Sequence, residues 1–405
     1  MVRSARLLFT YLSRVSPRDR LLAWYRGGLR AVDAETLVYD HLVESGPHPG
    51  RITVLAVGKA AAGMCRGAAR ALGAVSGICV SNQPDLVPDG VELLIGDHPI
   101  VGPRSIEAGR RILELAAQTS GPCIVLVSGG GSALCEFPLD GVAPEFITGV
   151  TAELVSSGAP IDEVNLIRTH LSAIKGGGLA HVIGGDFETL VISDVAGHGP
   201  ELVASGPTIP SDHQPDRALD LLRAHGHVVP VSVEDAVRRT RPAIRESKVA
   251  VIGDGMTAAR AMSQAAMEDG CQAMVDQDWI WGPVEDVLDR LLSIDFEGLL
   301  VAAGEPVMAV HGDGVGGRNT HASLLAAIRI AHTPLIFAAM ATDGSDGNSG
   351  AAGAVVDGTT LMRGGDPHQA LERCDSAGYL RNTGDLVITG DTGTNVADLW
   401  ALWRP

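Results

Sequence analysis

Short apolar runs that alternate with helical patterns constrain this fold more than any other feature of the sequence. Several of the runs lack polar alternation and are bounded by Gly or Asp, as is typical of strands covered on both faces. Such alternation predicts an α/β protein with mainly parallel sheets and crossover helices. The candidate strands are residues 52–58, 76–82, 91–96, 123–128, 189–195, 248–253, 272–275, 298–304, 307–312, 334–344 and 385–390, and the candidate helices are 59–72, 103–118, 145–156, 213–224, 256–269, 283–293 and 320–331.

The length of 405 residues is typical of two domains. Residues 226–248 carry prolines and charges and separate two blocks of strand–helix alternation. We therefore place the domain boundary near residue 240. Residues 1–240 form a larger, Rossmann-like domain in this prediction and residues 241–405 a smaller one. The Arg-rich start of the chain is predicted to form an amphipathic helix rather than a transit peptide, because its apolar spacing continues past residue 20.

Charge and cysteine content exclude several classes of protein. A net charge of −17 without any Lys/Arg run argues against nucleic-acid binding. No apolar run reaches about 18 residues, so we expect no membrane partner. The six cysteines are scattered and form no CxxC pair, which is typical of reduced cytoplasmic proteins. The oligomeric state stays open, a homodimer included.

Glycine-rich turns follow two of the predicted strands in the first half of the chain. Ligands of open α/β sheets lie beyond the carboxyl ends of strands. Lys59 follows the strand 52–58, and it is one of only three lysines in the chain. After the strand 123–128, three glycines can turn backbone amides toward an anion, although a plain tight turn is the alternative. This loop comprises Ser128, Gly129, Gly130, Gly131 and Ser132.

Two further segments of the first half carry polar residues of interest. If residues 163–175 are helical, Arg168, Ser172 and Lys175 fall near one face. A solvated face is the alternative, but the glycines at 176–178 suggest close approach to a ligand. Asp194 ends a buried strand, where a carboxylate is costly without a task or a partner.

The second half repeats this arrangement. Glu305 follows one strand, Asp343 follows another, and Arg318 and Asn319 follow a glycine segment at 312–317; Thr392 and Asn395 follow the strand 385–390. The spacing of the acids after residue 342 does not fit a calcium loop. Any one of these segments alone can be a simple turn, but their joint position at strand ends favours a ligand site.

Long ordered motifs give the chain a family resemblance. GKAAAGM, SGGGSAL, NLIRTHLSAIKGG, ISDVAGHGPELVASGPT, VGGRN, ATDGSDGNSGAAGAVVDG and ITGDTGTNVADL strongly resemble glycerate 2-kinases with a C-terminal MOFRL domain, over about residues 50–400. The resemblance implies two α/β domains with the active site in the cleft between them. It also implies ATP-dependent phosphorylation of the 2-hydroxyl of D-glycerate, or of a closely related hydroxy-acid. The catalytic residues that it implies are Lys59, Asp194, Arg318 and Asp343.

Phosphoryl transfer depends on positioning and charge neutralisation, and roles can be assigned on that basis. The glycine loop and Lys59 hold ATP phosphates or the substrate carboxylate, and Arg318 neutralises the transferring group. One of Asp194 and Asp343 deprotonates the substrate hydroxyl. Glu305 and Asp343 are the candidate Mg²⁺ ligands. The expected cofactor-binding residues are Ser128, Gly129, Gly130, Gly131, Ser132, Lys175, Asn319, Thr392 and Asn395, with structural support as the alternative for Lys175.

The sequence departs from the family pattern near the expected cleft. Thr320 and His321 replace a Gln-Glu pair, His198 and Gly199 stand where acidic residues are usual, and a single glycine precedes Glu305. Two alternatives remain. One is a hydroxypyruvate reductase, since residues 312–317 fit GxGxxG, although no acid lies where a ribose partner is expected. The other is a non-catalytic homologue that binds nucleotides or sugar acids, against which the four catalytic candidates argue together.

Overall fold

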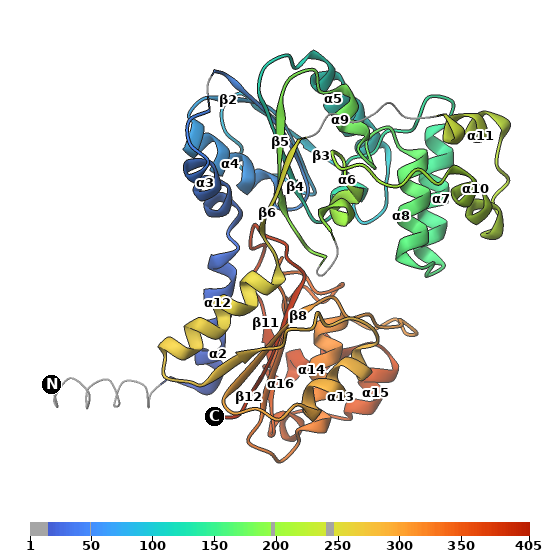
Figure 1. The fold of residues 1–405 in the computed structure, drawn as a ribbon. Helices are drawn as coiled ribbons and strands as arrows, with labels where there is room; N and C mark the ends of the chain where they lie inside the picture. Colours follow the sequence, from blue (N-terminus) through green and yellow to red (C-terminus); the bar gives the residue numbers. More distant parts are fainter. Residues whose placement is uncertain (1–14, 49, 196–198, 240–246) are drawn as a thin grey trace. The chain divides into compact units, whose positions relative to one another are not determined.

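A computed structural model describes residues 15–48, 50–195, 199–239 and 247–405, which form two compact units (Figure 1). The N-terminal unit comprises residues 33–253 with 393–395, and the C-terminal unit comprises residues 15–32, 254–392 and 396–405. Residues 15–32 thus belong with the second half of the chain. The boundary predicted at residue 240 lies outside the described residues and stays a prediction, as does the part of the predicted first helix that falls on residues 1–14.

The N-terminal unit is built on a parallel sheet. Its strand order, β3-β2-β1-β4-β5-β6, is that of doubly wound nucleotide-binding folds, whose ligands lie where the order reverses, between β1 and β4. Leu55 of β1 lies between Ile78 of β2 and Val125 of β4. The prediction of a parallel sheet is confirmed here. The strands are β1 (Ile52–Val57), β2 (Val75–Ser81), β3 (Val91–Ile95), β4 (Cys123–Ser128), β5 (Phe187–Ile192) and β6 (Lys248–Gly253).

Helices cover both faces of this sheet (Figure 1). One face packs against α5 (Pro103–Gln118), α6 (Gly131–Leu134) and α9 (Gly178–Val182), which share an apolar core with β1 and β4. On the other face, α4 (Ala61–Leu72) lies against β1 and β2, and α3 (Ala34–Glu44) packs on α4.

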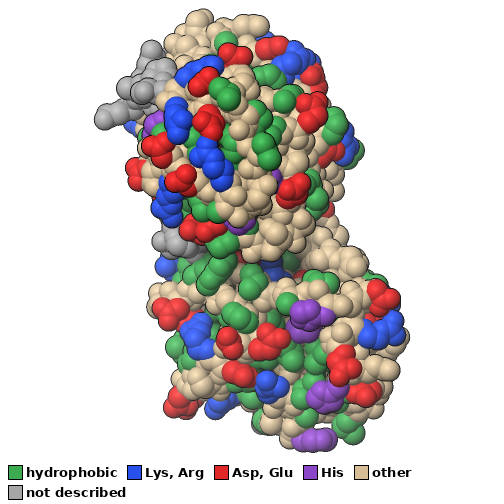
Figure 2. Space-filling model, turned by 90° about the vertical axis from the view of Figure 1, so that its right-hand side faces the viewer, with side chains coloured by type: hydrophobic (Ala, Val, Ile, Leu, Met, Phe, Trp, Pro, Cys, Tyr) green, Lys and Arg blue, Asp and Glu red, His purple; other side chains and the backbone are tan. Residues whose placement is uncertain are grey.

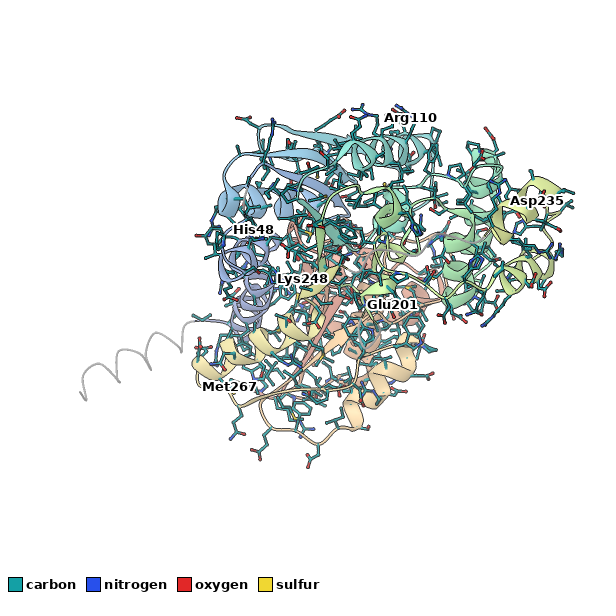
Figure 3. The ribbon with its side chains drawn as sticks, turned by 45° about the horizontal axis from the view of Figure 1, so that its top comes forward. His48, Arg110, Glu201, Asp235, Lys248 and Met267 are labelled. Atoms are coloured by element: carbon teal, nitrogen blue, oxygen red, sulfur yellow. The ribbon has the colours of Figure 1, made fainter. Side chains whose placement is uncertain are left out.

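A helical layer at one side of the N-terminal unit has its own apolar core. It comprises α7 (Pro144–Ser156), α8 (Ile161–Leu171), α10 (Pro215–Ala224) and α11 (Val231–Arg238), where Asp235 is labelled in Figure 3. The helix predicted over 163–175 ends earlier, at Leu171. Ser172 is extended, and its hydroxyl accepts hydrogen bonds from the backbone amides of Ile174 and Lys175. The chain then continues through glycines with positive φ at 176 and 177 into α9.

The sheet of the C-terminal unit is mixed, and this corrects the expectation that both sheets are mainly parallel. Its order is β11-β10-β9-β12-β8-β7; β7 and β8 are parallel, and the other pairs are antiparallel. No strand was predicted for β10 or β12, and 307–312 is not a strand. The strands are β7 (Ala273–Val275), β8 (Leu299–Gly304), β9 (Ile336–Ala341), β10 (Gly353–Asp357), β11 (Leu386–Val387) and β12 (Asp398–Trp403).

Helices also cover the sheet of the C-terminal unit. α13 (Val284–Ser293), α14 (Arg318–Arg329) and α16 (Ser376–Thr383) share its main apolar core. α12 (Gly255–Glu268) contacts β7, β8 and β12, and α2 (Pro17–Ala31) packs along α12. Shorter elements are α15 (Pro367–Glu372), η2 (Thr360–Arg363) and, in the N-terminal unit, η1 (Pro200–Ser205).

Specific contacts attach α2 to the C-terminal unit. Trp24 meets Trp403 edge-on with ring centroids 4.7 Å apart, and the hydroxyl of Tyr25 donates to the carbonyl of Ala341 at 2.8 Å. Arg20 pairs with Asp269 at 2.8 Å. Since these partners lie far along the chain, α2 depends on the later half of the sequence for its packing.

Two surface properties bear on the classes of partner. Among the helices of the described residues, none has the length and apolar character needed to cross a membrane. On the face drawn in Figure 2, acidic and basic side chains are interspersed rather than separated into large patches.

Candidate functional site

The first candidate site is the glycine loop at the carboxyl end of β4. Gly130 has a φ of 82°, which favours glycine, and α6 begins directly after it. The backbone amide of Lys59 donates to the carbonyl of Gly129 at 2.9 Å, and that of Ala60 donates to Ser128 Oγ at 3.1 Å. The turns after β1 and β4 are therefore joined at the point where the strand order reverses.

Side chains from three other segments lie directly on this loop. A Cβ atom at Gly129 would lie 1.9 Å from Asp194 Oδ2 and 2.5 Å from Asn395 Nδ2. The amide of Asn395 donates to Asp194 Oδ2 at 3.3 Å. A Cβ atom at Gly130 would lie 3.1 Å from Cγ of Lys59. The structure thus brings Lys59, Asp194 and Asn395 together around the predicted glycine loop, and at position 129 only glycine leaves room for Asp194 and Asn395.

His98 is a neighbour of the loop that was not predicted as a site residue. Its Nε2 would lie 3.5 Å from a Cβ atom at Gly130. The residue follows β3, so the rule of examining residues after each strand could have found it.

The far end of the loop faces η1. Ser132 Oγ lies 2.8 Å from Ser205 Oγ, and a Cβ atom at Gly131 would lie 2.6 Å from that of Ala204. Glu201, labelled in Figure 3, marks the first turn of η1. The hydroxyl of Ser132 thus contacts η1.

Lys175 lies inside the N-terminal unit. Its side chain is fully buried, and its ammonium pairs with the carboxylate of Glu136, which is also fully buried. The hydroxyl of Ser172 donates to the same carboxylate. This position favours the structural alternative for Lys175 over contact with a nucleotide. Glu136 was not predicted as a site residue.

The second candidate site is a charged cluster at one edge of the C-terminal sheet. Asp398 begins β12 and pairs in register with Gly304 of β8 and Ala341 of β9. Glu305 and Asp343 follow these two strands, so three carboxylates lie at the same edge. Asp398 was not predicted because it precedes an antiparallel strand, whereas the candidate residues of the second half all follow predicted strands.

Arg318 connects two of these carboxylates. Its Nε donates to Asp398 Oδ2 at 2.6 Å and its Nη2 to Asp398 Oδ1 at 3.2 Å, while Nη1 donates to Glu305 Oε1 at 2.9 Å. Burial disfavours the charged guanidinium, but the negative charges of Asp398 and Glu305 outweigh it and raise the pKa of Arg318. The guanidinium of Arg318 therefore stays positively charged, and its three hydrogen bonds fix its orientation.

The carboxylates predicted as metal ligands already have protein contacts. Glu305 accepts from Arg318, and Asp343 accepts from the backbone amide of Ser345 at 2.9 Å. Within the described residues, no three or more His, Cys, Asp or Glu side chains form a group that could hold a metal ion. Mg²⁺ commonly binds through one or two carboxylates together with substrate phosphates, so the donor set fits a metal that enters with a nucleotide.

The N-terminus of α14 is occupied by a side chain of the protein. Asp346 accepts from the backbone amides of Asn319 at 2.9 Å and Thr320 at 2.8 Å. Burial raises the pKa of Asp346 to about 6, although these hydrogen bonds oppose the shift. Asn319 is buried, and its Oδ1 accepts from Trp400 Nε1 at 2.8 Å. Nucleotide binding by Asn319 stays a prediction, and its visible contacts belong to the core.

Thr392, like Asn319, has a hydrogen bond within the protein: its hydroxyl donates to the carbonyl of Thr342. Its contact to nucleotide also stays a prediction. The predicted site residues therefore fall in two groups, one in each unit, and their joint action is treated below as part of the proposal.

The GxGxxG segment at 312–317 has a packing role. A Cβ atom at Gly312 or Gly314 would lie 2.2 or 2.5 Å from the carbonyl oxygen of Arg373, and one at Gly316 would lie 2.5 Å from Ser376 Oγ. The segment does not follow a strand, and Asp346 caps the helix after it. Both differ from a dinucleotide-binding turn, where a strand precedes the glycines and a pyrophosphate occupies the helix N-terminus.

Comparisons with known proteins place this architecture in a family. Residues 20–238 match the family described as "Domain of unknown function (DUF4147)", and residues 298–398 match the MOFRL family. A D-glycerate 2-kinase of Thermotoga maritima is 35% identical over 373 residues, covering 86% of this chain and 89% of its own. A crystal structure of glycerate kinase from the same organism superposes with a TM-score of 0.85 at 32% identity, covering 96% of this chain and 99% of that chain.

A protein of Agrobacterium vitis, with the provisional name of hydroxypyruvate reductase, is 33% identical over 417 residues, or 96% of this chain and 94% of its own. The chain belongs to the glycerate 2-kinase family, with a DUF4147 region followed by a MOFRL region. The resemblance seen in the sequence is confirmed, and so is the two-part α/β fold.

Two of the departures from the family pattern, Thr320 and His321, have contacts that explain them. Thr320 Oγ1 accepts from the amide of Gly317 at 2.9 Å and from Ser376 Oγ at 3.0 Å, so it stabilises the start of α14. His321 is nearly buried and faces Glu285 at 3.7 Å; burial lowers its pKa, and Glu285 partly opposes this. His198 lies outside the described residues.

Proposed function

We propose that this protein is an ATP-dependent kinase that phosphorylates the 2-hydroxyl of D-glycerate, or of a closely related small hydroxy-acid, giving 2-phosphoglycerate and ADP. The observation that carries the proposal is the convergence of Lys59 and Asp194 on the glycine loop at the carboxyl edge of the parallel sheet. Membership of the glycerate 2-kinase family supports the same reaction.

The residues of the loop suit a nucleotide phosphate. Backbone amides at Gly129–Gly131 and the ammonium of Lys59 supply donors and positive charge without a bulky side chain at the contact. ATP enters as its Mg²⁺ complex, and the metal neutralises phosphate charge. Glu305 and Asp343 are the oxygen donors that we assign to that metal.

Asp194 or Asp343 is the carboxylate that we assign to the substrate hydroxyl. The hydroxyl oxygen forms a bond to the γ-phosphorus, the bond between that phosphorus and the β–γ bridging oxygen breaks, and the hydroxyl proton passes to the carboxylate. Asn395 orients Asp194 for this task through its amide. We assign Arg318 to the charge of the transferring group, and the joint action of the two groups of residues is part of the proposal.

Two other assignments complete the proposal. We place the enzyme in the cytoplasm, and its partners are small molecules. The reductase alternative loses its motif, because the glycines at 312–317 serve packing against residues 373–376.

The decisive experiment is a panel of small hydroxy-acids with Mg-ATP, in which ADP release is followed and the product is identified by phosphorus NMR. We expect acid-dependent ADP release and a phosphate ester at C2 of glycerate. Oxidation of NADH with hydroxypyruvate alone, without any acid-dependent ADP release, contradicts the kinase. Nucleotide binding without turnover of any acid favours the non-catalytic homologue.

A further inference from the structure

Arg168 is a buried cation of α8 that the reaction described above does not use. Its exposed fraction is 8%, and its Nε is buried without a hydrogen-bond partner. Among the described residues, none accepts a hydrogen bond from its guanidinium. An arginine is rarely enclosed without a partner, since an uncompensated buried charge is costly.

The carboxylate that acts electrostatically on Arg168, Glu136, is already engaged by other groups. Glu136 Oε2 pairs with Lys175, and Oε1 accepts from the hydroxyl of Ser172 and from the amide of Phe137 at 2.9 Å. Glu136 still acts electrostatically on Arg168, where burial lowers the pKa of the guanidinium and this carboxylate opposes the shift. Arg168 is thus a second cation beside the ion pair of Lys175 and Glu136, and its own guanidinium has no hydrogen-bond acceptor among the described residues.

Other polar groups lead from Arg168 to the glycine loop. Asn165 lies three residues before Arg168 and so on the same face of α8. Its Oδ1 accepts a long hydrogen bond from Ser205 Oγ at 3.5 Å, and Ser205 Oγ lies 2.8 Å from Ser132 Oγ. This row of hydroxyl and amide groups ends at Ser132, two residues beyond Gly130.

A carboxylate is the anion that these features fit best. The buried guanidinium of Arg168 carries one positive charge, and the planar fork of an arginine matches the two oxygens of a carboxylate. A nucleotide phosphate carries several charges and has the glycine loop and Lys59 available to it.

We propose that Arg168, together with Asn165 and the hydroxyls of Ser132 and Ser205, binds the carboxylate of the substrate and selects hydroxy-acids over polyols of the same size. This inference rests on the proposed kinase function for its link to turnover, but the binding site itself can be tested without turnover.

The kinetic test compares Arg168→Gln with the wild type. Charge-assisted hydrogen bonds to an arginine support an increase of about 10–100-fold in KM for D-glycerate, with KM for ATP changed less than about twofold. Asn165→Ala, at a partly exposed position, raises KM for glycerate by about 3–10-fold. Arg223→Gln is the matched control, because Arg223 is an exposed arginine of the same helical layer; it leaves both constants unchanged.

Thermal unfolding separates a binding role from a structural one. We expect ligand-free Arg168→Gln to melt at or above the wild-type temperature, because an uncompensated charge has been removed. D-glycerate then raises the melting temperature of the wild type but not of Arg168→Gln, while glycerol raises neither.

The outcomes that overturn the proposal are distinct from those that overturn the kinase. An unchanged KM for glycerate in Arg168→Gln and Asn165→Ala refutes it, and so does a rise confined to KM for ATP. If the wild type phosphorylates no acid, the proposed kinase function is refuted. The changes in melting temperature with D-glycerate, glycerol and inorganic phosphate then test the carboxylate-binding site by itself. No shift with D-glycerate, or a shift with phosphate alone that Arg168→Gln abolishes, then refutes a carboxylate site. If Arg168→Gln does not fold, Asn165→Ala decides by the same two measurements.

Discussion

The ion pair between Arg318 and Asp398 allows a quantitative prediction for Asp398→Asn. Asp398 is wholly enclosed, whereas the side chain of Arg318 is 31% exposed and keeps Glu305 as a second partner. Breaking a fully buried pair costs about 3–5 kcal/mol. Because Arg318 retains both water and Glu305, we expect a loss of about 2–3 kcal/mol in the free energy of unfolding of the C-terminal unit, or about 4–12 °C in its melting temperature.

The assay can observe this unit alone. All five tryptophans, at 24, 279, 281, 400 and 403, lie in the C-terminal unit. Tryptophan fluorescence in a urea or thermal titration therefore reports its unfolding. Glu305→Gln is the matched control: it removes the other carboxylate, whose side chain is 40% exposed, and we expect a loss below about 1 kcal/mol. Equal losses for the two variants, or no loss for Asp398→Asn, refute the assignment of the stability to the enclosed partner.

Three further predictions concern the two sites. Lys59→Ala lowers kcat/KM by about 100-fold or more and leaves the melting temperature unchanged, because Lys59 is partly exposed and supplies charge to the loop; retained turnover contradicts its catalytic role. Gly129→Ala forces Asp194 and Asn395 away from the loop and abolishes turnover, whereas Gly149→Ala, a helical position with nothing within 4 Å of its new methyl group, stabilises the fold by up to about 1 kcal/mol. Asp346 has a folded-state pKa of about 6 against 3.8 in the unfolded chain, so the folded state holds its proton more tightly and its contribution to stability is lost as the pH rises from about 4 to about 6. Asp346→Asn should flatten the pH dependence of tryptophan-monitored unfolding in that range, and an unchanged slope contradicts the raised pKa.

The sequence was sufficient for the parallel sheet and its glycine loop because their signals are local. Consecutive apolar residues predict β1, β4 and β5, and the turns after them bring Lys59, Gly129 and Asp194 to one edge by the geometry of parallel strands. β12 could not be predicted in the same way, since it becomes a strand by pairing with both β8 and β9, which precede it by many residues. Asp398, which begins β12, was therefore not predicted either.

Burial was the second property that local patterns could not supply. The spacing of Arg168, Ser172 and Lys175 suggested a shared face, but the helix ends at Leu171 and Lys175 turns to Glu136 inside the fold. Similarly, Asn319 follows a glycine segment, as a ligand-binding residue often does, yet its amide meets Trp400 from the last strand. In both cases the partner is distant in the sequence.

The assignment of α2 to the C-terminal unit has a consequence for biosynthesis. α2 ends at Ala31, and its packing partner α12 begins at Gly255. At about 5–20 residues per second, a ribosome needs on the order of 10–45 s to make the intervening chain. During that interval residues 33–253 can fold, while Trp24 still lacks Trp403 and Tyr25 still lacks the carbonyl of Ala341. A nascent-chain holdase would therefore find an apolar binding segment in α2, and release of that segment would be timed by translation of the last third of the sequence.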